Sequence, residues 1–413
     1  MPSPRLRLPP ALRHRGFALL WAGLLISVAG SQMQFAGMLW HLRVLSDQPA
    51  VVSAIGLARF LPVLLFAPLG GVVADSFNRR AVMLVTQTTA MLVALALGFV
   101  TWLGIVRLWH LYLLTAVHMT AVSFDLPARQ ALTPNLVDRD DLPSAFSLMS
   151  IAFSTGAVVG PAAGGVLIAG PGLAYVYWVN AVSYLAIIGA LLAMGGVPQA
   201  RQAAVRGVRQ TLVFMRDGAR FILSQPVILS SMVLDFIATF FSSANTLLPF
   251  VARDVLNLGG RAYGWLVSGQ SIGAVAVGVF LSQRTRVRRQ GLVLLISVMV
   301  FGFSTILFGI GRSFWWVLTA LMLVGASDGV STILRNTIRQ LNTPDELRGR
   351  MVAINQVFFM GGPQLGEIEA GLVAQAFGTP AAIISGGVGA ILGVGLVALI
   401  WPQLRRYDGG EAR

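Results

Sequence analysis

The chain has 413 residues, of which 56% are hydrophobic and only 11% are charged. Soluble domains carry about 25% charged residues, so this chain is too apolar for a water-exposed surface and is predicted to lie in a lipid bilayer. The net charge is +14, but the 30 basic residues lie in short clusters between apolar runs and form no continuous basic face, which excludes nucleic acid as a partner. All 30 are arginines, and the absence of lysine excludes a phosphate-binding P-loop.

Twelve apolar runs are long enough to cross the hydrocarbon core, which takes about 20 helical residues. The first run is too long for a signal peptide and is interpreted as a retained span. The longest loop, 196–226, separates an N-terminal half (1–195) from a C-terminal half (227–413). The sequence therefore predicts an all-α membrane protein with twelve transmembrane helices in two six-helix bundles. The predicted spans are 17–41, 51–74, 81–103, 108–125, 143–169, 173–195, 227–252, 262–283, 290–311, 313–335, 350–377 and 380–402.

The arginines set the predicted orientation, because cytoplasmic loops carry an excess of basic residues. With the N-terminus inside, 24 arginines are cytoplasmic, five are external and Arg59 lies within a span. Both termini are therefore expected in the cytoplasm of a bacterial cell, with the chain in its inner membrane.

The loop after the second span reads Gly-Val-Val-Ala-Asp-Ser-Phe-Asn-Arg-Arg from Gly71 to Arg80. We expect Gly71 to let helices approach closely, Asp75 to pair with a helix end or an arginine, and Arg79 and Arg80 to hold the loop inside. Asn78 tolerates the left-handed conformation, so it can preserve the turn. The alternative is a simple topological anchor.

The fifth span carries a glycine-rich pattern, G-x3-G-P-x2-G-G. Small residues at this spacing allow close helix crossing, and the proline removes a backbone hydrogen bond and bends the helix. Ordinary packing is the alternative to a functional role. The pattern comprises Gly156, Gly160, Pro161, Gly164 and Gly165.

The two halves repeat at an offset of roughly 205 residues. Asp125 and Arg129, followed by an acidic pair and a glycine-rich span, recur as Asp328 and Arg335 followed by a similar sequence. Six spans per half give both halves the same topology, which is typical of parallel repeats about an axis along the membrane normal.

These motifs resemble those of the major facilitator superfamily. The loop from Gly71 resembles its G-x-L-A-D-R-x-G-R-R signature, with Ser76 and Asn78 departing from it, and the fifth-span pattern resembles an antiport motif of exporters. The segments at 124–132 and 343–351 are similar to the branch of enterobactin exporters and macrolide efflux proteins. The resemblance implies the major facilitator fold and export of bulky amphipathic compounds.

In the fold that the resemblance implies, spans two and eleven face each other. Arg59, Glu367 and Glu369 then lie at similar depths, about 12–15 Å below the outer ends of these spans at 1.5 Å of rise per residue. We expect Arg59 to pair with one glutamate, because residues two apart point in different directions. This pair is a candidate outer gate and coupling site, with a static structural pair as the alternative.

Burying an ionisable side chain inside a span costs several kcal/mol of free energy, so such a residue indicates a function. Asp235 has no cation near it in the sequence and is our first candidate for a protonatable carboxylate, with Asp328, Asp125 and His118 as further candidates. Arg129 and Arg335 are candidate inner-gate partners of Asp125 and Asp328, although each pair can be end-of-helix charge. A lone histidine such as His118 is more often hydrogen-bonded packing.

Several polar and aromatic residues of spans one and seven are candidate contacts for an amphipathic substrate, and most are expected to pack in the core or against lipid. They are Gln32, Gln34, Phe35, Trp40, Phe240, Phe241 and Asn245.

No cofactor, metal site or enzyme activity is predicted. The chain has no cysteine, its four histidines are scattered and no nucleophile–base pair is evident. The expected partners are the lipid bilayer and a small-molecule substrate, with no obligate protein partner. The predicted function is secondary export of a drug, siderophore or metabolite by proton antiport and alternating access. Uptake, lipid translocation and a non-transporting sensor are the alternatives.

Overall fold

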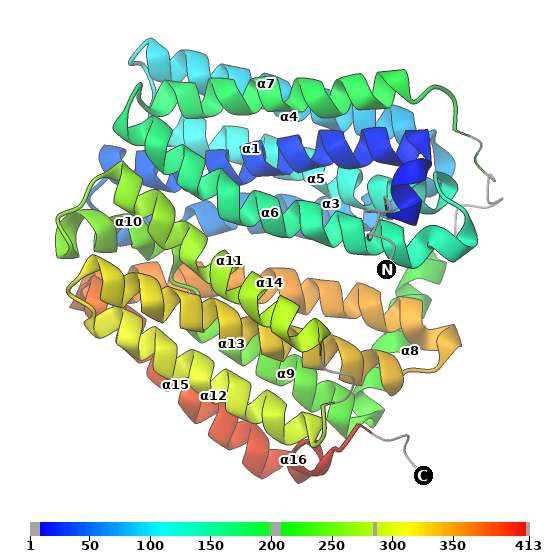
Figure 1. Cartoon of the computed structure of the whole chain (residues 1–413). Helices are drawn as coiled ribbons and strands as arrows, with labels where there is room; N and C mark the ends of the chain where they lie inside the picture. Colours follow the sequence, from blue (N-terminus) through cyan, green and yellow to red (C-terminus); the bar gives the residue numbers. More distant parts are fainter. Residues whose placement is uncertain (1–8, 198, 200–207, 284–286, 410–413) are drawn as a thin grey trace, which may run out of the picture. The chain divides into compact units, whose positions relative to one another are not determined.

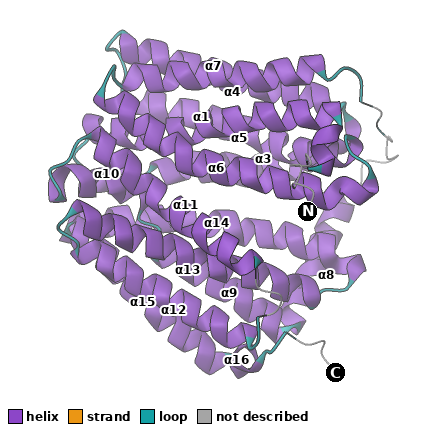
Figure 2. Ribbon diagram, viewed as in Figure 1, coloured by secondary structure: helices purple, strands orange, loops and turns teal. Residues whose placement is uncertain are grey.

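A computed structural model of the chain describes residues 9–197, 199, 208–283 and 287–409 (Figure 1). Within these ranges every regular element is a helix and none is a strand (Figure 2). Helices suit this sequence because they satisfy their backbone hydrogen bonds internally, which a lipid environment demands.

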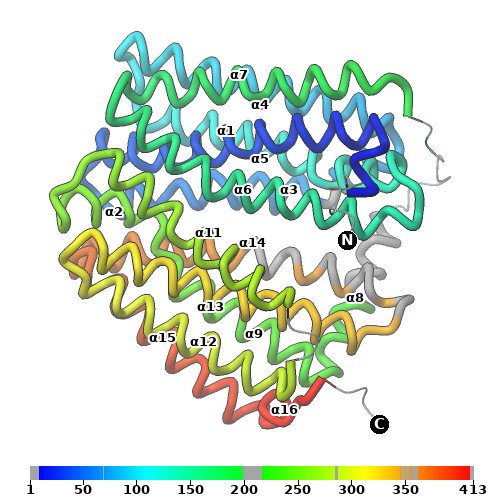
Figure 3. The backbone as a smooth tube through the Cα atoms, viewed as in Figure 1, coloured from blue at the N-terminus to red at the C-terminus, as the bar shows by residue number. Residues whose placement is uncertain are grey.

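The first of two compact units comprises residues 1–38 and 61–205. Helix α4 lies beside α5 and α7 in this unit (Figure 3). Buried Leu24, Met83, Ala94 and Ile187 belong to its core. Its elements are η1 (Pro10–Arg13), most of α1 (Arg15–Leu45) and of α3 (Ile55–Ser76), α4 (Arg79–Trp102), α5 (Leu108–Leu132), η2 (Thr133–Asn135), η3 (Arg139–Asp141), α6 (Leu142–Ala169) and α7 (Leu173–Ala193).

The second unit comprises residues 39–60 and 206–413. Helix α12 packs along α13 and α15 here. Its elements are α2 (Pro49–Ser53), α8 (Val208–Ser224), α9 (Pro226–Phe241), η4 (Asn245–Leu247), α10 (Leu248–Phe250), the π-helix η5 (Val251–Val255), α11 (Gly260–Ser282), α12 (Gln290–Ile310), α13 (Phe314–Leu341), α14 (Asp345–Phe377), α15 (Thr379–Ile400) and α16 (Pro402–Arg406).

Eleven helices of the described part are long and apolar enough to cross a membrane. The remaining predicted span, 350–377, lies in α14, whose 33 residues extend about 50 Å. The prediction of a polytopic all-α membrane protein is confirmed.

The seventh predicted span, 227–252, is not one continuous helix. Helix α9 ends at Phe241, and the chain passes through 3-10, α and π turns before residue 255. Ser242, Ser243 and Asn245 fall at the break, and serine and asparagine have lower helix propensity than the apolar residues of α9 such as Leu234 and Met232.

The fifth-span glycines let α6 lie directly on α1. A Cβ atom on Gly160 would stand 2.5 Å from the Ala29 carbonyl oxygen, and one on Gly156 would stand 2.7 Å from Val28 Cγ1. Gly164 approaches Met33 in the same way. These three residues recur every four positions and so share one face of the helix. Pro161 and Gly165 are also buried.

In the loop motif from Gly71 to Arg80, the roles that we expected for Gly71 and Asn78 differ from those in the structure. A Cβ atom on Gly71 would meet nothing within 4 Å, whereas one on Gly70 would stand 2.1 Å from the Ser123 carbonyl oxygen. Close approach to α5 therefore depends on Gly70. Asn78 has φ −65°, not a left-handed value, and its Oδ1 caps α4 by accepting from Ala81 N–H at 3.1 Å.

The two arginines of this motif bind helix ends. Arg79 Nη1 donates to the Ala131 carbonyl at 3.0 Å, near the end of α5, and Arg80 Nη2 donates to the Leu192 carbonyl at 3.2 Å, near the end of α7. Cations are favourable at these positions because the last carbonyls of a helix lack partners. Asp75 is exposed and makes no ion pair with the described residues.

Candidate functional site

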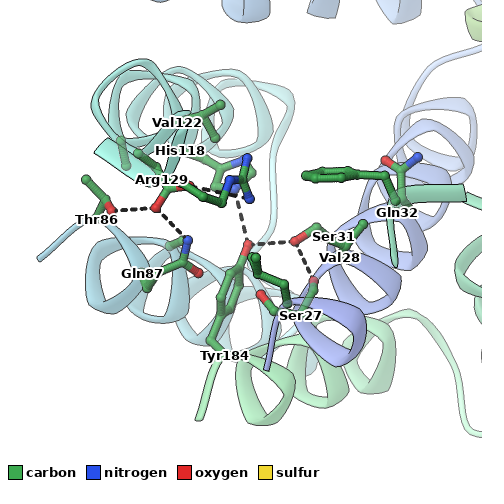
Figure 4. Close-up of a pocket in the computed structure, with 15 residues that line it drawn as sticks. Ser27, Val28, Ser31, Gln32, Thr86, Gln87, His118, Val122, Arg129 and Tyr184 are labelled. Carbon is green, nitrogen blue, oxygen red and sulfur yellow. Dashed lines mark hydrogen bonds and ion pairs between the residues drawn. The ribbon is translucent and has the colours of Figure 1, made fainter. Parts of the chain in front are cut away.

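A polar cavity of about 220 Å³ lies inside the first unit (Figure 4). Helices α1, α4, α5, α6 and α7 all contribute to its wall. Its polar lining residues are Ser27, Ser31, Gln32, Thr86, Gln87, His118, Asp125, Arg129 and Tyr184. A cavity with convergent polar groups inside a membrane-spanning bundle is a default candidate for a ligand site.

Asp125 is the carboxylate of this cavity. Its Oδ1 accepts hydrogen bonds from Gln87 Nε2 at 2.8 Å and from Thr86 Oγ1 at 3.0 Å. Its Oδ2 lies 3.7 Å from Arg129 Nη1, one helical turn further along α5, so the structure contains the predicted Asp125–Arg129 contact. The Arg129 guanidinium also covers the ring of Phe153, 4.9 Å from its centroid.

A second polar chain crosses the same cavity. Tyr184 OH lies 3.2 Å from His118 Nε2 and 3.0 Å from Ser31 Oγ, and Ser31 Oγ donates to the Ser27 carbonyl at 2.8 Å (Figure 4). His118 is therefore hydrogen-bonded and faces the cavity at the same time.

The second unit contains a polar cavity of its own, of about 260 Å³. Asp328 and the predicted substrate contact Asn245 both line it. Asp328 and Asp125 occupy equivalent places in the sequence repeat, and each of them lines a cavity of its own unit. The predicted partner Arg335 contacts Asp328 Oδ1 at 3.3 Å.

Asp235, the first candidate for a protonatable carboxylate because it has no cation near it in the sequence, has two cationic partners in the structure. Asp235 is 2% exposed and forms ion pairs with Arg335 at 2.9 Å and with Arg339 at 3.1 Å. Both arginines are also buried. They lie about a hundred residues further along the chain, so sequence proximity could not reveal them, and the packing of α13 on α9 brings them together.

Arg59 and Glu367 lie within the second unit, with Arg59 Nη1 3.5 Å from Glu367 Oε2. Glu367 is 2% exposed. Glu369 is half-buried and makes no ion pair with the described residues, consistent with its different direction on α14.

Sequence reasoning missed a stronger contact at the C-terminal end of α1. Arg43 binds Asp254 through two nitrogens, at 2.8 and 3.2 Å, and also pairs with Asp47. The guanidinium lies 4.7 Å from the centroid of the Phe250 ring. Between this contact and Arg59, Ser53 Oγ and Thr246 Oγ1 form a buried hydrogen bond of 2.8 Å. The Arg43–Asp47 pair has i, i+4 spacing, so the sequence could have indicated it. Asp254 lies 211 residues from Arg43, so local spacing could not indicate that pair.

Most of the other predicted substrate contacts are packing residues. Gln34 is buried and accepts from Asn180 Nδ2 at 2.7 Å, and the Trp40 ring packs at a tilt against Tyr263 with centroids 5.0 Å apart. Phe240 packs on Phe236 and Phe241, and the Phe241 ring covers Gly389. Gln32 lines the first cavity, and Phe35 is half-buried in α1.

Solved structures with the same fold cover nearly all of the chain. One is a POT family transporter in complex with a thioalcohol-conjugated peptide, with a TM-score of 0.73 at 12% identity, covering 94% of this chain and 96% of that one. A bacterial homologue of the human lysosomal transporter Spinster, in an inward-facing and occupied conformation, gives a TM-score of 0.69 at 14% identity, with coverages of 95% and 97%. The human organic anion transporter MFSD10 (TETRAN) gives 0.64 at 16%, with coverages of 94% and 100%.

Sequence comparison identifies the family. The enterobactin exporters EntS of Shigella boydii serotype 18 and Escherichia coli O1:K1 / APEC are each 28% identical over 340 residues, which is 82% of this chain and 80% of theirs. The family described as transmembrane secretion effector matches residues 8–411. These findings confirm the resemblance seen in the motifs. The chain therefore belongs to the transmembrane secretion effector family of the major facilitator superfamily.

Proposed function

We propose that this transporter exports a small amphipathic organic compound from the cytoplasm by proton antiport and alternating access. The observation that carries the proposal is Asp125, a buried carboxylate at the wall of a polar cavity within membrane-spanning helices. The similarity to proteins named enterobactin exporters supports the outward direction.

Asp125 replaces Asp235 as the proposed proton-carrying group, because its environment can respond to a proton. Its Oδ1 is held by Thr86 and Gln87, while Oδ2 has only the longer contact to Arg129. A proton on Oδ2 removes the charge that attracts Arg129 and so weakens that pair. Proton binding would thereby change the polarity of the cavity wall.

The cavity also offers groups that suit an amphipathic ligand. The Gln87 side chain lines the cavity, and its buried Oε1 makes no hydrogen bond within the described residues. Tyr184 and Phe153 supply aromatic surface beside it. Such a mixture of apolar surface and a few polar groups is typical of small-molecule sites.

The residues at 39–60 provide the proposed outer gate. In this structure they belong to the second unit, held by Arg43–Asp254, Ser53–Thr246 and Arg59–Glu367. We propose that these contacts break when the outer side opens and reform when it closes. Orientation in the inner membrane with both termini in the cytoplasm is part of the same proposal.

The test uses purified protein in proteoliposomes, with enterobactin and ethidium as separate probes and a pH-sensitive dye to follow protons. Transport should depend on the pH gradient and should release protons in the opposite direction. Asp125→Asn should reduce this coupled transport at least tenfold, whereas Asp138→Asn, the same change at a side chain that is 88% exposed, should not. Full transport after collapse of the proton gradient would reject proton coupling. Movement of the probes only toward the cytoplasmic face of the protein would reject export.

A further inference from the structure

The break after α9 lies beside the cavity of the second unit. The helical ladder stops at Ser242, whose N–H donates to the Ala238 carbonyl, and Ala244 N–H turns back to the Ser242 carbonyl at 3.0 Å. Helix α9 has 16 residues, and its C-terminal end carries partial negative charge. Discontinuous membrane helices place such ends at ion and substrate sites.

Ser242 supplies an independent indication of a ligand. It is 9% exposed, it lines the cavity, and its Oγ makes no hydrogen bond with the described residues. Buried hydroxyl groups normally have a partner, and an unpaired one in a native structure calls for a water or an ion.

The polar atoms around this cavity favour a cation. Its polar lining consists of hydroxyl, amide and carboxylate side chains from Ser242, Ser243, Asn245, Gln270, Ser271 and Asp328, besides Thr239. Among the described residues, no arginine or histidine belongs to the lining. Oxygen atoms of this kind are the donors that hard cations prefer and that an ammonium group donates to.

The charge of Asp328 is only partly compensated. Arg335 Nη2 lies 3.3 Å from Asp328 Oδ1, but the same guanidinium also pairs with buried Asp235 at 2.9 Å. Arg339 pairs with Asp235 as well. The Asp328 side chain is 46% exposed, unlike the buried Asp235, so it can meet a ligand in the cavity.

We propose that this cavity binds a small cation through the Asp328 carboxylate, the Ser242 hydroxyl and neighbouring side-chain oxygens. The cation is either a free alkali ion such as Na⁺ or the primary ammonium group of a transported compound, since the two share this chemistry. Binding of this kind is independent of whether Asp125 carries a proton, so the two proposals can fail separately.

The test measures thermal unfolding of the purified full chain in detergent at constant ionic strength, with choline chloride as the baseline. Sodium chloride and methylammonium chloride are titrated in turn. A ligand that binds only the folded state raises the unfolding midpoint with a saturable dependence on concentration. We expect saturation with at least one cation: sodium alone identifies a free ion site, and methylammonium alone identifies an ammonium subsite.

Two variants locate the site and one serves as the matched control. Ser242→Ala removes no hydrogen bond present in the structure, so it should fold normally and weaken cation affinity at least tenfold. Asp328→Asn should weaken it further, and Asp125→Asn, the same change in the other cavity, should leave it intact. Absence of a saturable response to both cations, or an unchanged response in Ser242→Ala and Asp328→Asn, would overturn the proposal.

Discussion

At the scale of single residues, Asp125 and Asp235 show how the same side chain acquires different roles. Both are buried in membrane-spanning helices. Asp235 is held between two arginines, whereas Asp125 has neutral donors on one oxygen and a 3.7 Å contact to Arg129 on the other. Charges buried without partners are costly, and Asp235 of α9 compensates two buried arginines of α13.

Removing the charge of Asp235 should destabilise the protein. Asp235→Asn leaves Arg335 with one acidic partner and Arg339 with none among the described residues. Breaking a buried pair typically costs about 3–5 kcal/mol of unfolding free energy. Denaturant unfolding in mixed micelles measures the loss, with Asp138→Asn as a control that should cost under about 1 kcal/mol. Equal stability of Asp235→Asn and the wild type would contradict this role.

The sequence could predict residue pairs only at helical spacing or through the family resemblance. Asp125–Arg129 has the i, i+4 spacing that places two side chains on one face. Arg59–Glu367 followed from the resemblance, since these residues lie in spans two and eleven. Arg339–Asp235 and Arg43–Asp254 join distant positions without a motif, so only the packed structure reveals them.

At the scale of elements, small residues decide how closely helices pack. Gly160 allows the Ala29 carbonyl and the Met33 amide of α1 to pass within 3 Å of where a Cβ atom would stand. Both neighbours are backbone atoms and cannot move aside as a flexible side chain would. The glycine pattern was visible in the sequence, but the helix it approaches was not.

Gly160→Val should therefore push α6 away from α1. Overpacking of this kind costs about 1–3 kcal/mol, and here it also disturbs the cavity that both helices line. Thermal unfolding should show a lower midpoint and the efflux assay a lower rate. Gly189→Val is the matched control, because a Cβ atom on this exposed glycine of α7 would meet nothing within 4 Å. Equal effects of both substitutions would argue against helix contact as the cause.

At the scale of the whole molecule, the boundary between the compact units does not follow the loop at 196–226 alone. It also falls within α1 and α3, because residues 39–60 pack with the C-terminal half of the sequence. Three polar contacts accompany this packing: Arg43–Asp254, Ser53–Thr246 and Arg59–Glu367. Glycines assist it, since a Cβ atom on Gly371 would stand 2.3 Å from Ser53 Cβ.

A disulfide across this packing should stop transport. The chain has no cysteine, so Ser53→Cys with Thr246→Cys introduces one defined pair where two side-chain oxygens lie 2.8 Å apart. Oxidation should reduce efflux of ethidium or enterobactin at least tenfold, and dithiothreitol should restore it. Ser53→Cys alone should be insensitive to oxidation. Undiminished transport by the fully oxidised double variant would show that these residues need not separate.

Membrane orientation is predicted from 24 internal against five external arginines and can be tested by labelling. Single cysteines replace Ser76 and Ile105, both of which are exposed. A membrane-impermeant maleimide should label Ile105→Cys in intact cells and Ser76→Cys only after permeabilisation. The reverse pattern would invert the proposed topology and with it the direction of export.

The sequence by itself determined the family, the all-helical membrane fold and the repeat, because these depend on composition, on runs of about 20 apolar residues and on local motifs. It also indicated six ionisable residues inside the spans, with Asp235 as the first candidate for protonation: Arg59, Asp125, Asp235, Asp328, Glu367 and Glu369. Only the tertiary structure decided that Asp235 is paired with two arginines, where the seventh span breaks and which unit contains residues 39–60. These features depend on contacts between residues far apart in the chain, and hydropathy and local spacing contain no information about such contacts.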